Sequence, residues 1–270
     1  MSAGRLVVCP TPIGNLSDVT LRVLAVLRSA DVVACEDTRR TSRLLSHHAV
    51  RARSLVSYHE HNEAARAPSL VARLLDGAVV ALVSDAGMPA VNDPGYVLIR
   101  AALDAGVQVE VLPGPSAVLV ALVASGLPAD RWRFAGFLPR RASELPALLS
   151  SPETVVAFES PRRIAATLAV LAEVDETRPV AVCRELTKLH EEVVRGTAAE
   201  VAVRYADEPP RGEVVLVIGG APPRSGLDPA AVDAVRRLVA AGARPRPAAT
   251  VVADLTGAPA NALYRAVAES

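Results

Sequence analysis

Short runs of β-branched residues recur through the first 117 residues, and they constrain the fold more than any other feature of the sequence. Such runs occupy residues 5–10, 31–36, 77–84 and 106–113, with helix-like segments between them. Because apolar residues fall at both odd and even positions, we expect both faces of these strands to be buried. Strands of this kind that alternate with helices are typical of a parallel sheet covered on both sides.

The helix between the first two runs can be placed from its leucines. Leu21, Leu24 and Leu27 recur at helical spacing, and the preceding Ser17 and Asp18 are residue types that favour the N-cap position. We therefore expect Ser17 or Asp18 to cap this helix.

The rest of the chain divides into two further regions. The middle region repeats the alternation, with a passage broken by Pro and Gly at residues 126–146 and strand-like runs at residues 153–160, 178–186 and 212–221. The last region has only helical patterns, and Gly257 between two of them outlines a helix-turn-helix. We predict an α/β protein with two α/β domains (1–117 and 118–222) and a small helical tail module (223–270). A single larger sheet is the alternative.

Composition limits the compartment and the classes of partner. Lys+Arg and Asp+Glu are balanced at 29 each, so net charge identifies no partner. The three cysteines, Cys9, Cys35 and Cys183, lack metal-ligand spacing, which predicts buried reduced thiols. The longest apolar stretch, residues 117–124, is shorter than the ~20 residues that span a bilayer. We expect a soluble cytoplasmic protein with no membrane partner.

Proline and glycine concentrate where the predicted strands end. The loops PTPIGNL, CEDTRRT, SDAGMPAVNDPG and PGPSA follow the four strands of the first region, and neither G-x-G-x-x-G nor a Walker A motif is present. Ligands of parallel sheets bind at this edge. Proline fixes dihedrals and glycine lets the backbone approach a ligand, so these loops suit a ligand with adenine, ribose and amino acid parts. Simple turns are the alternative.

Seven motifs together carry a family resemblance. In chain order they are PTPIGNLSDVTLRVL, ACEDTRRTSRLL, YHEHNE, LVSDAGMPAVNDPG, LPGPSAVLVALVASGLP, FESPRRI and CRELTKLHEE. From Cys9 to about Gly219 the chain resembles the small-subunit ribosomal RNA (cytidine-2′-O)-methyltransferases of the tetrapyrrole methylase superfamily. The resemblance implies two α/β domains with S-adenosyl-L-methionine in the cleft between them, a homodimer, and small-subunit rRNA or the 30S particle as substrate.

The resemblance also implies which residues bind the cofactor. They are Asp85, Gly87, Met88, Pro89, Ser116, Ala117, Phe158, Glu159 and Leu186. For Asp85 the alternative is an Asx turn within its own loop. Phe158 and Leu186 have the alternative of ordinary core packing.

For methyl transfer the protein mainly has to orient the reactants and exclude water, because the methyl group of a sulfonium is already activated. A general base for the ribose hydroxyl adds roughly 100-fold or more. The candidates are Glu36, Asp37, Glu60, Glu185 and Lys188. Lys188 is the only lysine of the chain and, unlike arginine, a lysine can be deprotonated. A salt bridge to a neighbouring glutamate is the alternative for Lys188.

Clusters of arginine point to RNA in spite of the zero net charge. Basic stretches with interleaved aromatic residues fit phosphate contacts and base stacking. The candidates are Arg39, Arg40, Arg43, Arg131, Arg133, Arg140, Arg141, Arg162 and Arg163. Solvated arginine faces are the alternative. The helical tail has one basic residue in its second helix, Arg265, so we expect an RNA-contacting or capping module rather than a DNA reader.

The motif YHEHNE raises the question of a metal. His59 and His61 lie beside Glu60 and Glu63, but no third histidine has suitable spacing, and methyl transfer needs no metal. We expect no metal site. Two rival functions remain open: methylation of a small tetrapyrrole, and a non-catalytic RNA-binding assembly factor.

Overall fold

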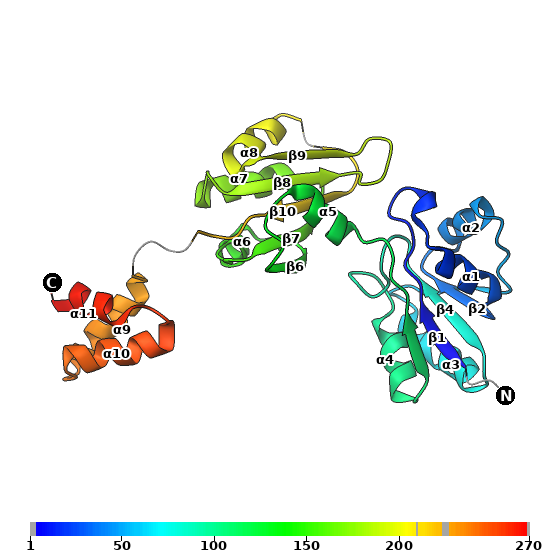
Figure 1. The fold of residues 1–270 in the computed structure, drawn as a ribbon, viewed down its shortest axis with the longest axis horizontal. Coiled ribbons are helices and arrows are strands. Elements are labelled where there is room, and N and C mark those ends of the chain that lie inside the picture. Colours follow the sequence, from blue (N-terminus) through cyan, green and yellow to red (C-terminus); the bar gives the residue numbers. More distant parts are fainter. Residues whose placement is uncertain (1–3, 209, 223–226, 269–270) are drawn as a thin grey trace. The chain divides into compact units, whose positions relative to one another are not determined.

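The computed structural model describes residues 4–208, 210–222 and 227–268. The chain forms two compact units, Met1–Gly220 and Ala221–Ser270, and each is described by itself. The larger unit contains two five-stranded sheets rather than one larger sheet (Figure 1). The α/β fold class is therefore confirmed.

The first sheet is parallel throughout, with the order β3-β2-β4-β1-β5. Its strands are β1 (Arg5–Val8), β2 (Val32–Cys35), β3 (Leu55–Ser57), β4 (Val79–Val83) and β5 (Gln108–Val111). Helices α1 (Leu21–Ser29) and α2 (Thr38–His47) pack on one face, and α3 (Glu63–Leu75) and α4 (Tyr96–Asp104) on the other. Along β1, Val7 belongs to the first core, which lies beneath α1 and α2, and Leu6 to the second core, which lies beneath α3 and α4. This alternation is expected of a strand that is buried on both faces.

The predicted cap of α1 was wrong. Thr20 caps this helix through its side chain, which accepts from the Val23 N–H, whereas Ser17 and Asp18 lie in a separate 3₁₀ turn, Leu16–Asp18. The reason is Val19, which is buried in the first core with an extended backbone and separates the turn from the helix.

The second sheet is mixed, with the order β6-β7-β10-β8-β9. Its strands are β6 (Trp132–Phe137), β7 (Thr154–Glu159), β8 (Pro179–Arg184), β9 (Glu192–Thr197) and β10 (Val214–Ile218). Strands β6 and β7 are parallel, but β10 runs antiparallel to β7 and β8, and β9 antiparallel to β8. One face packs on α6 (Leu145–Leu149), α7 (Ile164–Val174) and α8 (Ala198–Ala206), which follow the 3₁₀ turn Ala142–Glu144, and the other on α5 (Ala117–Ser125).

The smaller unit is a three-helix cluster of α9 (Pro229–Ala240), α10 (Pro245–Thr256) and α11 (Ala260–Ala268). Val235, Val252 and Leu263 form its core. Gly257 ends α10 in the left-handed conformation, φ 72°, so the expected helix, glycine turn and helix are confirmed. Within the described ranges, no helix combines the length and apolar character needed to cross a bilayer. The three cysteines are free and buried, as predicted.

Candidate active site

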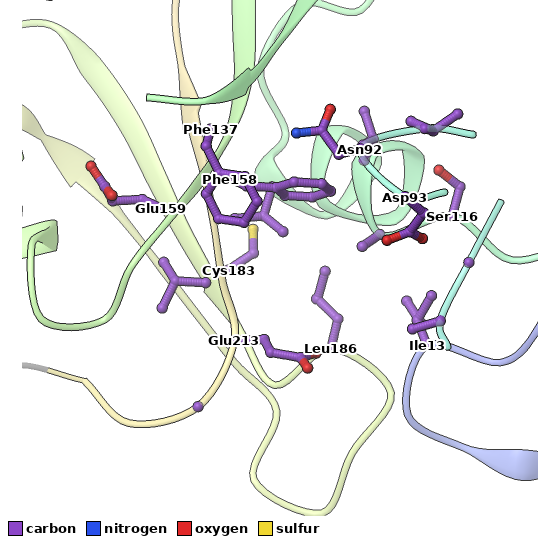
Figure 2. A pocket seen from close by; sticks show the side chains of 18 of the residues that line it. Ile13, Asn92, Asp93, Ser116, Phe137, Phe158, Glu159, Cys183, Leu186 and Glu213 are labelled. Carbon is purple, nitrogen blue, oxygen red and sulfur yellow. The ribbon is translucent and has the colours of Figure 1, made fainter. Parts of the chain in front are cut away.

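A cavity of about 470 Å³ lies in the larger unit, between loops that follow strands of the two sheets (Figure 2). The loops after β1, β4 and β5 line it from the first sheet. The ends of β6, β7 and β8 and the start of β10 line it from the second. Because β10 is antiparallel to β7 and β8, its first residues reach the same edge as their carboxyl ends. The cavity thus occupies the position where α/β sheets bind ligands.

Most of the expected cofactor residues line this cavity. They are Gly87, Met88, Ser116, Ala117, Phe158, Glu159 and Leu186. Asp85 and Pro89 are not among the lining residues. Further lining residues were not expected from the sequence: Ile13, Ala86, Val91, Asn92, Asp93, Val118, Phe137, Ser160, Pro161, Cys183, Gly212, Glu213, Val214 and Val215. Ile13, Asn92 and Asp93 lie inside quoted motifs, so motif position alone could have suggested them.

The loop after β4 has an unusual backbone. Gly87 and Gly95 have positive φ, and so do the non-glycine residues Ala90 (66°) and Asn92 (58°). For non-glycine residues such conformations cost about 1–3 kcal/mol each and cluster at functional sites. Paired hydrogen bonds of 2.9 Å join the main chains of Gly87 and Thr11 in both directions, which fixes this loop to the one after β1.

Asp85 connects two loops. Its carboxylate accepts a 2.9 Å hydrogen bond from the backbone N–H of Asp37 and lies 3.4 Å from the Arg40 guanidinium. The side chain therefore ties the loop after β4 to the start of α2. Any effect of Asp85 on a ligand in the cavity passes through the position of this loop.

Three acidic side chains gather at the ends of β2 and β4. Burial and the charge of Asp85 raise the pKa of Glu36. Burial and the charge of Glu36 raise the pKa of Asp93 to about 7, with a smaller effect of Asp85, while a hydrogen bond to Ser84 acts in the opposite direction. Of the three, Asp93 lines the cavity.

The second sheet contributes an apolar wall. The Phe158 ring packs edge-to-face on Phe134, with ring centres 5.0 Å apart, and in a tilted arrangement on Phe137, with ring centres 5.5 Å apart. Leu186 lines the cavity and also belongs to the core beneath α5, which confirms the core packing given above as its alternative. Ligand contact and core packing are therefore compatible here.

Glu159 has an internal role. Its buried carboxylate accepts hydrogen bonds from Arg163, from the Thr167 hydroxyl at 2.7 Å and from the Ser160 N–H at 2.7 Å. Figure 2 shows this carboxylate turned away from the other lining side chains. Its acceptor atoms are already used by the protein.

None of the five expected bases lines the cavity. Asp37 caps α2, and hydrogen bonds from Arg39 lower its pKa to about 2. Glu60 is exposed. Glu185 accepts from Lys188 at 2.8 Å and from the Glu213 N–H, which lower its pKa.

Lys188 forms the salt bridge given above as its alternative. Its ammonium lies 2.8 Å from Glu185 and 3.0 Å from Glu213. Burial disfavours the ammonium, but these two hydrogen bonds raise the pKa overall, so the amine stays protonated. The same segment contacts the loop after β1, where Thr187 accepts a 3.1 Å hydrogen bond from the Asn15 N–H.

The expected RNA-binding arginines fall into two groups. Arg39, Arg40 and Arg141 pair with Asp37, Asp85 and Glu144, Arg133 donates to the Leu148 carbonyl, and Arg163 binds Glu159. Arg43, Arg131, Arg140 and Arg162 are exposed and form no ion pair within the described part of the chain. The second group is free to meet phosphates.

His59 and His61 stack edge-to-face, with ring centres 5.9 Å apart. The side chain of Asn62 holds the His59 Nε2 at 3.1 Å. Across residues 4–208, 210–222 and 227–268, no group of three or more His, Cys, Asp or Glu side chains is arranged as a metal site.

Comparisons with known proteins agree with this geometry. Residues 5–202 match the family model of the Tetrapyrrole (Corrin/Porphyrin) Methylases, and residues 226–270 match the RsmI C-terminal HTH domain. The chain is 46% identical over 265 residues to ribosomal RNA small subunit methyltransferase I of Mesorhizobium japonicum, covering 96% of this chain and 90% of that protein. A protein of the same name from Micromonospora olivasterospora is 46% identical over 272 residues, covering 98% and 87%.

A solved structure has the same fold at lower identity. Uroporphyrin-III C-methyltransferase from Thermus thermophilus, solved with S-adenyl homocysteine, is 22% identical, with a TM-score of 0.56 over 80% of this chain and 97% of that one. At this identity the likeness concerns the fold alone. The family model and the two relatives together show that the chain is a methyltransferase of the tetrapyrrole methylase family, in its ribosomal RNA small subunit methyltransferase I branch.

Proposed function

We propose that this protein transfers a methyl group from S-adenosyl-L-methionine to the ribose 2′-oxygen of a cytidine in small-subunit (16S) ribosomal RNA. The observation that carries the proposal is the cavity, which is lined by the same motifs that carry the family resemblance. Relatives that are 46% identical bear the ribosomal RNA methyltransferase name over nearly the whole chain, which favours RNA over a tetrapyrrole.

The lining of the cavity suits this methyl donor. Its volume of about 470 Å³ lies within the range of small-molecule sites. Ile13, Val118 and Phe158 offer apolar surface for an adenine, and Gly87, which has a positive φ and no side chain, lines the same space. When bound, the donor supplies an activated methyl group on a positive sulfonium. Gly87, Met88, Ser116, Ala117, Phe158 and Leu186 would contact it, with Asp85 and Pro89 fixing the loop.

The RNA would be held outside the cavity by unpaired arginines. Arg162 follows Pro161, which lines the cavity, and Arg140 lies three residues after Phe137, the last residue of β6, which also lines it. Arg131 precedes β6, at the other end of that strand. Arg43 lies on α2. Exposed guanidinium groups suit the phosphate backbone. We assign the helical unit an RNA-contacting or capping role as well.

A homodimer is part of the proposal. Helix α5 exposes Leu119 and Val123, at 50% and 78%. Exposed apolar side chains on one helix are typical of a subunit interface. Light scattering of the purified protein measures the subunit number directly, and a monomer at all concentrations would contradict this part.

The decisive experiment uses labelled S-adenosyl-L-methionine with 30S particles from a strain that lacks the modification. We expect label in the small-subunit RNA, at a cytidine ribose after nuclease digestion. Labelled tetrapyrrole in a parallel reaction would favour the small-molecule rival. Binding of 30S particles without any transfer would favour the assembly factor.

A further inference from the structure

Three carboxylates line the cavity among the described residues, and they differ in their partners. Glu159 is bound by Arg163, and Glu213 lies 3.0 Å from Lys188. Asp93 has no ion-pair partner in the part of the chain that the structure describes. It is thus the lining carboxylate that remains free to accept a proton.

The backbone around Asp93 is held firmly. Asn92 before it has φ 58°, and Pro94 after it has a fixed φ, so the loop cannot relax easily. The Ala90 N–H donates to the Pro94 carbonyl at 3.3 Å, and the Gly95 N–H donates to Glu63 at 3.3 Å. Figure 2 shows the Asp93 side chain on the same side of the cavity as Ser116, with Phe158 and Cys183 toward the other side.

The surroundings of Asp93 favour its neutral form in the free protein. Burial and the negative charges of Glu36 and Asp85 raise its pKa to about 7, and the Ser84 hydroxyl partly opposes them. Electrostatic interactions with Arg40 and His59 lower the pKa of Glu36, in opposition to burial. A base whose pKa lies near the working pH combines a useful deprotonated fraction with real basicity.

We propose that Asp93 is the general base of the methyl transfer, accepting the proton of the ribose 2′-hydroxyl. This inference rests on the function proposed above. The 2′-oxygen forms a bond to the methyl carbon, and the carbon–sulfur bond breaks with its electron pair moving to sulfur. The hydroxyl proton passes to the Asp93 carboxylate and then to water, so the products are a 2′-O-methyl ribose, a neutral thioether and one released proton.

The test measures single-turnover methylation of undermodified 30S particles at saturating donor, from about pH 5 to about pH 9. For the wild type we expect a rate that rises with unit slope and levels at or below about pH 7, since a bound sulfonium lowers the pKa of a nearby carboxylate. For Asp93→Asn, the plateau rate of methylation should fall about 100-fold or more, and the inflection in the pH–rate profile should disappear. Calorimetry should give a donor affinity within about 2-fold of wild type, because the asparagine keeps the shape of the side chain.

Glu36→Gln is the matched variant. Removing its charge should move the inflection to lower pH, because the negative charge of Glu36 raises the pKa of Asp93. A ¹³C NMR titration of the free protein gives a readout without turnover: a carboxylate with a midpoint near pH 7 should disappear in Asp93→Asn.

Four outcomes would overturn the inference. If Asp93→Asn methylates at the wild-type plateau rate, Asp93 is not the general base. If Asp93→Asn no longer binds the donor, Asp93 acts in donor binding instead. Loss of the plateau in Glu36→Gln, with Asp93→Asn active, assigns the base to Glu36. If wild-type enzyme transfers no label at any pH, the proposed function itself fails, and the inference falls with it.

Discussion

The two sheets of the larger unit look alike in sequence and differ in construction. Strands β4 and β10 are both Val-rich and almost fully buried, yet β4 has parallel neighbours and β10 antiparallel ones. Both strands are central and covered by helices on two faces. The apolar pattern therefore reports coverage by helices and says nothing about strand direction.

The two halves also contribute different chemistry to the cavity. The first half supplies Asp93, whose pKa the nearby charges of Glu36 and Asp85 raise, and a loop with positive φ angles. The second half supplies aromatic and aliphatic side chains and binds its own acid, Glu159, internally. Glu159 in the second half is thus expected to serve stability, and Asp93 in the first half to serve the proposed reaction.

The largest expected effect is that of Glu159→Ala. Removing one member of a buried, hydrogen-bonded ion pair leaves Arg163 uncompensated, and we expect a loss of about 3–5 kcal/mol in the free energy of unfolding. Urea unfolding measures it. Asp104→Ala, which breaks an exposed pair with Arg100 on α4, is the control and should change stability by about 0.5 kcal/mol or less. If both variants changed the free energy of unfolding equally, the structural role assigned to Glu159 would be wrong.

Core truncation in each half asks whether the two sheets unfold together. Leu98 on α4 and Leu168 on α7 are both fully buried, at 0% exposure. Each Leu→Ala change should cost about 3 kcal/mol. Because residues up to Gly220 form one compact unit, both should lower the same unfolding transition. Two separate transitions, each sensitive to one variant, would show that the halves are independent.

Asp85→Ala tests the loop connection in the first half. Loss of the bond to the Asp37 N–H frees the loop after β4, and we expect donor affinity to fall about 10-fold, equivalent to about 1.4 kcal/mol. Affinity for 30S particles should change by less than about 2-fold. Calorimetry with the donor and filter binding with the particles give the two values. An unchanged donor affinity would refute the role assigned to this loop.

The pH dependence of stability tests the raised pKa of Asp93. The pKa of Asp93 is raised to about 7 from an ordinary value of 3.8, so its contribution to stability is complete below about pH 4 and is lost as pH rises through about 7. As the pH rises from about 5 to about 8, the free energy of unfolding of Asp93→Asn should therefore increase by about 1 kcal/mol relative to that of the wild type. This value allows for the partial exposure of the Asp93 side chain. Thermal unfolding at several pH values measures the difference. A constant difference would contradict the raised pKa.

The smallest effect concerns RNA. Arg43→Ala removes an exposed guanidinium without an ion pair among the described residues, and the slope of log affinity for 30S particles against log salt should become shallower by about 1. Arg100→Ala on α4, whose guanidinium pairs with Asp104, is the control and should leave the slope unchanged. The same slope for both variants would remove Arg43 from the RNA surface.

Most strands could be predicted from the sequence, including the edge strand β5, but three other edge strands could not. The three strands that the sequence pattern missed, β3, β6 and β9, all lie at sheet edges. None contains a fully buried residue, so the continuous apolar signal of a covered strand is absent. Strand β6 is further disguised by a register shift between Phe134 and Phe137, where Gly136 has positive φ.

The sequence by itself determined the α/β class, the Pro/Gly loops at the strand ends and, through seven motifs, the family. These follow from local composition and from residues close together in the chain. Only the tertiary structure decided that Lys188 pairs with Glu185 and Glu213, and that Glu159 pairs with Arg163. It also decided that the charged groups that raise the pKa of Asp93 are the acids Glu36 and Asp85. The protonation state of a side chain depends on burial and on charges brought close by folding, and sequence distance does not encode either.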